Sequence, residues 1–100
     1  MYVRINRGNF DPSKAQDVLE MLRKSEALLA SALKQLPGLH SHQTGIDTEQ
    51  GTMIAISTWD TIEHAKSLGQ LPEMNALRST FQQYGIVFEP ISTYDILWQV

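Results

Sequence analysis

The sequence has 100 residues, no cysteine and a formal net charge of -3. The length predicts one domain over residues 1–100, and the lack of cysteine excludes disulfides, thiolate metal sites and a thiol nucleophile. The 8 Lys and Arg residues are scattered among 11 acidic ones, which argues against nucleic acid as a partner, because phosphate binding needs clustered basic side chains.

The first residues are predicted to form a strand that leads into a long helix. Residues 1–10 alternate between the two faces of a strand and do not resemble a signal peptide. Asp11 is placed to cap a helix, and Pro12 suits its first turn. Apolar residues then recur at helical spacing, which predicts an amphipathic helix over about residues 12–35 that ends at Pro37-Gly38. With no apolar run of membrane-spanning length, we expect a soluble, cytoplasmic protein without a membrane partner.

A hairpin and a second helical region follow. The runs at 39–46 and 52–59 are strand-like and flank the turn-rich "DTEQG", which predicts a hairpin. Asp60 stands three residues before Glu63, the spacing of an acidic capping box, so we expect the helix to begin there with both carboxylates as caps. The second helical region is interrupted at "GQLP" and ends at Gly85.

The order of elements predicts an α+β fold. Pro90 divides the tail into a short extended piece and a final strand of about residues 92–99. The sum is a ferredoxin-like β-α-β-β-α-β domain, with a four-stranded antiparallel sheet and both helices on one face. Successive residues such as Ala55 and Ile56 are apolar on both faces, so we expect a second copy to cover the open face and form a homodimer through the sheets.

Two residues near the end of the third strand are candidates for chemistry. Trp59 would stack on an aromatic substrate, although packing is the commoner role of an indole at this position. His64 is predicted to lie in the first turn of the next helix, where the macrodipole disfavours imidazolium and keeps the ring able to accept a proton. The alternative is that His64 is a solvated surface residue.

Two histidines of the second strand form another candidate pair. His40 and His42 are separated by one residue and should project from the same face. That spacing can bring two imidazoles to one metal, but no third ligand is evident. We therefore expect no metal site, and we expect polar groups at the solvent edge or the pocket wall.

The first strand places Tyr2, Arg4 and Asn6 on one face. Arg4 could stabilise an anionic group or an enolate, with a salt bridge at the sheet edge as the alternative. Asn6 could orient a carbonyl or a peroxide, or it could end the strand by a hydrogen bond. Because the sequence contains neither a phosphate-binding glycine loop nor a nucleophile motif, we expect no cofactor.

The chain resembles the antibiotic biosynthesis monooxygenase (ABM)-like family of the dimeric α/β-barrel superfamily. The resemblance covers nearly the whole chain and rests on the element order and on "STWDTIEHA", "LPEMNALRSTF" and "TYDILW". It implies a homodimer in which each subunit holds a pocket between its helices and the sheet. Some such relatives oxidise quinols or anthrones without a cofactor, some degrade heme, and others have no established reaction.

The resemblance also suggests positions for the substrate. Leu68, Arg78 and Phe81 would contact it, together with Trp59 and Tyr2. Arg78 and Leu68 stand where the heme-degrading branch carries its heme-ligating His and a Trp, which argues against ordinary heme degradation. Ala55 stands where aromatic-oxidising relatives often carry an Asn.

The sequence leads to one function and two alternatives. The first is a monooxygenase that oxidises a small aromatic or quinol-type substrate with O₂, with His64, Asn6 and Arg4 as catalytic candidates. The second is a non-catalytic dimer that binds a small apolar or aromatic ligand or acts in stress. The third is a heme-binding or heme-degrading relative. Whether the protein is an enzyme is left open by the residues alone.

Overall fold

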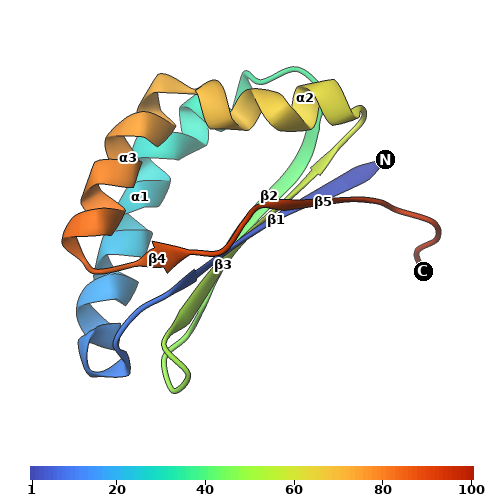
Figure 1. The fold of residues 1–100 in the computed structure, drawn as a ribbon. Coiled ribbons are helices and arrows are strands. Elements are labelled where there is room, and N and C mark those ends of the chain that lie inside the picture. Colours follow the sequence, from blue (N-terminus) through green and yellow to red (C-terminus); the bar gives the residue numbers. More distant parts are fainter.

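The computed structural model describes residues 1–100. It shows an antiparallel sheet that is covered on one face by helices (Figure 1). Short 3-10 turns at Pro12–Lys14 and Leu68–Gln70 precede the first and third helices. The predicted β-α-β-β-α-β order and the ferredoxin-like α+β fold are confirmed. The elements are β1 (Tyr2–Asn9), α1 (Ala15–Lys34), β2 (Leu39–Asp47), β3 (Thr52–Trp59), α2 (Ile62–Ser67), α3 (Pro72–Gln83), β4 (Val87–Phe88) and β5 (Ser92–Asp95).

The sheet has the order β2-β3-β1, with β4 and β5 both on the free side of β1. β4 pairs with the end of β1 and β5 with its beginning, so the two short strands share one position in the sheet on either side of Pro90. The predicted final strand at 92–99 is too long, because β5 ends at Asp95. Beyond it, the Ile96 amide donates to the Met1 carbonyl as the last contact between the two segments.

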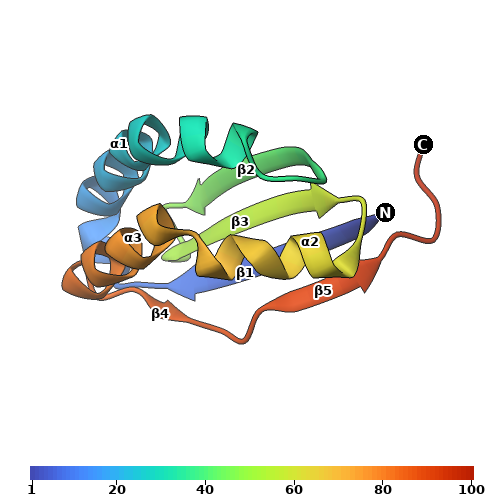
Figure 2. The same ribbon diagram turned by 90° about the horizontal axis from the view of Figure 1, so that it is seen from above.

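The helices on the covered face lie over different strands of the sheet. Seen from above, α1 lies over β2, whereas α2 lies over β3 and β1 (Figure 2). A cluster of buried apolar side chains fills the space between helices and sheet. It includes Phe10, Val18, Met21, Leu22, Leu29, Leu33, Met53, Trp59, Leu68, Leu77, Phe81 and Ile86.

The helix starts follow from local capping. The Asp11 carboxylate accepts a hydrogen bond from the Ser13 amide at 3.0 Å, and Pro12 stands in the first turn, as predicted. The start of α2 differs from the prediction. Thr61 is its N-cap, and the Thr61 hydroxyl accepts from the His64 amide at 3.1 Å, because Thr61 has the extended backbone of a capping residue. The expected capping box of Asp60 and Glu63 is therefore wrong.

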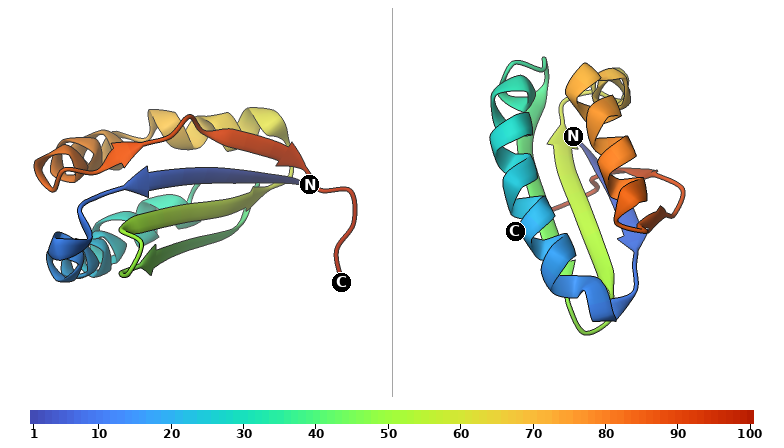
Figure 3. Two further views of the ribbon diagram at one scale, coloured as in Figure 1. Left: turned by 60° about the horizontal axis from the view of Figure 1, so that its bottom comes forward. Right: turned by 90° about the vertical axis from the view of Figure 1, so that its left-hand side faces the viewer.

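The face of the sheet away from the helices is open (Figure 1, Figure 3). The register places Val3, Ile5, Ile54 and Ile56 together on this face, and all four remain partly exposed. The chain after β5 extends beyond the sheet with further exposed apolar side chains, Leu97, Trp98 and Val100. No helix has the length and apolar character that crossing a membrane requires.

Candidate functional site

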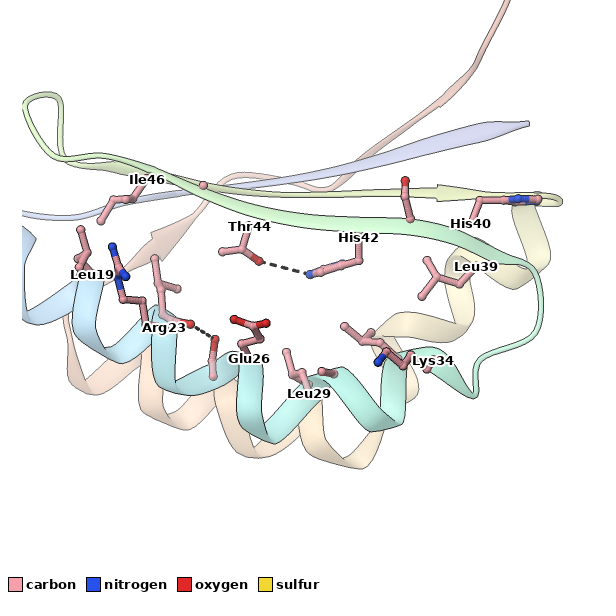
Figure 4. Close-up of a pocket in the computed structure, with 16 residues that line it drawn as sticks. Leu19, Arg23, Glu26, Leu29, Lys34, Leu39, His40, His42, Thr44 and Ile46 are labelled. Atoms are coloured by element: carbon pink, nitrogen blue, oxygen red, sulfur yellow. Dashed lines mark hydrogen bonds between the residues drawn. The ribbon is translucent and has the colours of Figure 1, made fainter.

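A cleft of about 670 Å³ opens between α1 and β2 (Figure 4). The middle of its wall is polar, with the Glu26 carboxylate of α1 directed toward the β2 side chains His42 and Thr44. The rest of the lining combines aliphatic side chains with the charged Arg23 and Lys34, which suits a small, largely apolar ligand held by a few polar groups. The aliphatic lining consists of Leu19, Leu22, Leu29, Ala30, Leu33, Leu39 and Ile46.

His42 is a titratable residue of the cleft, and one of its two ring nitrogens makes no hydrogen bond. Its Nε2 lies 3.4 Å from the Thr44 hydroxyl, and its Nδ1 is buried without a hydrogen-bond partner. Burial, and then the positive charge of Arg4, lower the pKa of His42 below its usual value of 6.5. The ring is therefore neutral at neutral pH, and with the proton on Nε2 the lone pair of Nδ1 is free to accept a proton.

His40 borders the cleft but does not point across it as His42 does. A β-bulge between Leu39 and Ser41 shifts the register of β2 against β3, which breaks the alternation at His40. Figure 4 shows His42 directed toward α1 while His40 is not. The expectation that both imidazoles share one face is wrong for this reason. Nowhere do three or more His, Asp or Glu side chains come close enough together to hold a metal ion.

Arg4 continues the polar wall behind His42. Arg4 on β1 lies opposite Ser57 on β3, and Ser57 lies opposite His42 on β2, so the three residues form one row on the helix-facing side. Arg4 is only 8% exposed. Burial, and then the nearby charge of Arg78, lower the pKa of Arg4. The single ion pair of the molecule joins His64 and Asp60, so Arg4 has no carboxylate partner.

A second row lies beside the first. It contains Asn6 on β1, Ala55 on β3 and Thr44 on β2. The Asn6 side-chain oxygen is buried and receives no hydrogen bond. Ala55 is partly exposed although β3 is an inner strand.

Arg78 is held at the break between the second and third helices. Its guanidinium donates to the Gly69 carbonyl at 2.8 Å and to the Asn75 side-chain oxygen. The side chain is exposed, so these contacts fix its direction without removing its charge from water. Arg78 therefore presents a fixed positive charge that acts on Arg4.

His64 forms a pair with Asp60 outside the cleft. His64 Nδ1 lies 2.7 Å from Asp60 Oδ1, and the two side chains are 41% and 43% exposed. The hydrogen bond from His64 is the main reason that the pKa of Asp60 is lowered. The loop before β2 packs so closely on this pair that a Cβ at Gly38 would collide with both side chains. Gly38 also has a positive φ of 80°, which glycine adopts readily.

The other residues expected at the site lie mostly in the core. Trp59 is fully buried, and its Nε1 donates to the Ser57 hydroxyl at 2.7 Å, so its indole N–H is already used. Leu68 and Phe81 are buried, and the Phe81 ring packs against Phe88 with centroids 5.4 Å apart. Tyr2 is half-buried at the start of β1. None of the eight predicted site residues lines the cleft, although Arg4 borders it through His42.

The polar part of the cleft is formed by Glu26, His42 and Thr44, of which the sequence pointed only to His42, as a polar group at the solvent edge or the pocket wall. The signal for two of them was present, because His42, Thr44 and Ile46 alternate along β2 once the bulge is passed. Glu26 carries no such signal, since it lies in the middle of an amphipathic helix among other charged residues. Its direction becomes clear only from the packing of α1 over β2.

The helices on one face of a curved antiparallel sheet, with a cleft between them, define an ABM-like fold of the ferredoxin-like class. Solved structures with this fold match the chain end to end. A proposed antibiotic biosynthesis monooxygenase from Deinococcus radiodurans has a TM-score of 0.76 at 17% identity, with 100% of this chain and 96% of that one covered. No protein-family model matches the sequence, and no curated protein does either.

Two further structures add descriptions of function and assembly. A dimeric ferredoxin-like protein from an uncultured marine organism has a TM-score of 0.74 at 14% identity, covering 99% of this chain and 96% of its own. SnoaB, a cofactor-independent oxygenase from Streptomyces nogalater, has a TM-score of 0.67 at 13% identity, covering 99% and 95%. At these identities the likeness establishes the fold.

Proposed function

We propose that the protein is a cofactor-independent monooxygenase that oxidises a small aromatic or quinol-type substrate with O₂. The observation that carries this proposal is the half-buried, neutral His42 with a free ring nitrogen in the polar middle of a partly aliphatic cleft. An oxygenase of this kind needs a dry pocket and a base that forms the substrate anion. The likeness of the fold to SnoaB supports the same direction.

His42 acts as the base in this proposal, in place of His64. The free Nδ1 of His42 takes the phenolic proton of a bound quinol. The resulting anion is the reductant, and its ring carbon forms a C–O bond with O₂. The hydroperoxide then loses water, so that one oxygen atom stays in the hydroxyquinone product and the other leaves as H₂O. Arg4 stabilises the anion, and Asn6 orients the oxygen.

An oxygen electrode tests the reaction with a panel of quinols and anthrones, after correction for spontaneous oxidation. We expect His42→Leu to lower kcat by about 10²-fold or more, the usual contribution of a general base. The matched variant His64→Leu should retain the wild-type rate, because His64 lies outside the cleft. No oxygen uptake with any substrate, or full activity of His42→Leu, would exclude the proposed reaction and its base.

The same panel separates the two alternatives. Saturable binding of an aromatic compound without oxygen uptake would select a non-catalytic ligand-binding protein. A saturable shift of the heme Soret band would select heme handling. Arg78 stands where heme-degrading relatives carry the ligating His, and its guanidinium cannot serve as an axial ligand.

A homodimer is the second part of the proposal. The open sheet face carries Val3, Ile5, Ile54 and Ile56, and a second copy is the simplest cover for such a face. The description of one similar structure as dimeric supports this arrangement. Sedimentation equilibrium should give twice the subunit mass of 11.3 kDa. Ile56→Lys should shift the protein to monomer, while Lys24→Met on the exposed side of α1 should not. A monomeric wild type would contradict the proposal.

A further inference from the structure

We propose that the cleft and the polar rows behind it recognise an aromatic carboxylate, with Arg4 and Arg78 holding the carboxylate and Asn6 accepting a hydrogen bond from a hydroxyl on the ring. This inference rests on the proposed function for the identity of the reacting ring, but the binding of the acid is independent of any reaction with O₂.

The first support is an unpaired guanidinium in the interior. Arg4 is nine-tenths buried, makes no salt bridge and lies among neutral residues of the sheet. A buried charge without a partner is costly, so it usually marks a site where a ligand supplies the opposite charge. The fork of an arginine matches the two oxygens of a carboxylate, which a single hydroxyl does not.

The second support is that the nearest charge has the same sign. Arg78 is close enough for its positive charge to act on Arg4, and no carboxylate has a comparable effect. The hydrogen bonds to Gly69 and Asn75 hold Arg78 in place and leave its positive charge unneutralised. Two like charges fixed near one another are relieved when an anion lies between them.

The third support is an unpaired acceptor beside these charges. Asn6 lies in the second row with Ala55 and Thr44, directly beside the row of Arg4 and His42. Neighbouring strands lie about 4.8 Å apart, so Arg4 and His42 are separated by about 10 Å at their Cα atoms. A two-ring aromatic acid has a length comparable to this separation. The unpaired oxygen of Asn6 then meets a donor on the ring.

The test compares two ligands that differ only in charge. 1-Hydroxy-2-naphthoate and 1-hydroxy-2-naphthamide share the ring and the hydroxyl, and isothermal titration measures the binding of each. We expect the acid to bind the wild type at least tenfold more tightly than the amide. Arg4→Met should bring the two affinities together, Arg4→Lys should keep part of the difference, and Arg78→Met should reduce it. Lys24→Met removes an exposed positive charge of α1 and should leave the preference unchanged.

The outcomes distinguish this inference from the proposed function. Equal affinities for acid and amide, no binding of the acid by the wild type, or a full preference in Arg4→Met would overturn it. Oxygen uptake with uncharged quinols alongside equal affinities would leave the monooxygenase proposal standing and exclude the carboxylate site. A clear preference for the acid without oxygen uptake would do the reverse.

Discussion

Replacing Arg4 by Met should make the ligand-free protein more stable. The side chain is 8% exposed and carries its charge into the interior without a carboxylate partner. Met retains an apolar stem of similar length, so packing is largely kept while the desolvated charge is removed. Replacing buried charges by well-packed apolar side chains stabilises proteins by up to about 4 kcal/mol, and we expect about 1–3 kcal/mol here.

Urea unfolding followed by circular dichroism measures this change. The transition midpoint should rise with an unchanged slope, and each kcal/mol should raise Tm by about 4–8 °C for a domain of this size. Protein concentration must be held constant, because the proposed dimerisation would also contribute to stability. Lys24→Met on the exposed side of α1 is the matched control and should change the free energy of unfolding by less than about 0.5 kcal/mol.

The refuting result is a loss of stability in Arg4→Met. A fall of more than about 1 kcal/mol at unchanged slope would mean that Arg4 makes a favourable pairing in the folded protein. The unpaired guanidinium would then no longer argue for a ligand. A second measurement adds to this test, because 1-hydroxy-2-naphthoate at 100 times its Kd should stabilise the wild type by about 2.7 kcal/mol and Arg4→Met by much less.

Three further predictions concern His42, Thr61 and Ser57. The pKa of His42 is lowered in the folded protein, so as the pH falls His42 takes up a proton in the unfolded chain before it does so in the folded protein. The stability that neutral His42 contributes is therefore present above pH 6.5 and is lost as the pH falls toward the folded pKa. Urea titrations at several pH values should show this loss in the wild type and not in His42→Leu. Thr61→Ala should cost about 1 kcal/mol by removing the cap of α2, whereas Glu63→Ala should change little, and equal losses would restore the capping box. Ser57→Ala leaves the buried Trp59 N–H without an acceptor and should cost about 1–3 kcal/mol by chemical denaturation, with a neutral result indicating another acceptor.

The fold was predictable because its signals are local and repeat along the chain. The alternation of residues 1–10 and the apolar spacing of α1 each extend over several turns or pairs, so one exception does not hide them. The hairpin was located for the same reason, and β3 ends at Trp59 as predicted. The predicted length of the final strand is too great because its end depends on which residues of β1 pair with it. The two segments are far apart in the sequence, so no local pattern marks this end.

The site was harder to predict because single residues decide it. One bulge after Leu39 turns His40 away from the face of His42, and no sequence pattern announces it. Asp60 is a residue type that often caps helices, but the backbone conformation makes Thr61 the cap of α2. The Asp60 side chain instead contacts His64. Arg4 was placed on the correct face by alternation, while its lack of a partner became visible only from the packing around it.

The two tryptophans have opposite environments, which gives the protein two internal optical reporters. Trp59 is fully buried beside Ser57 at the end of β3, whereas Trp98 is 79% exposed in the segment after β5. An indole in a dry interior emits at shorter wavelength than one in water, so their fluorescence should separate. Trp59 will report unfolding of the core, and Trp98 will report whether the C-terminal segment is covered in the proposed dimer. Single Trp→Phe variants can therefore follow folding and assembly independently in one cuvette.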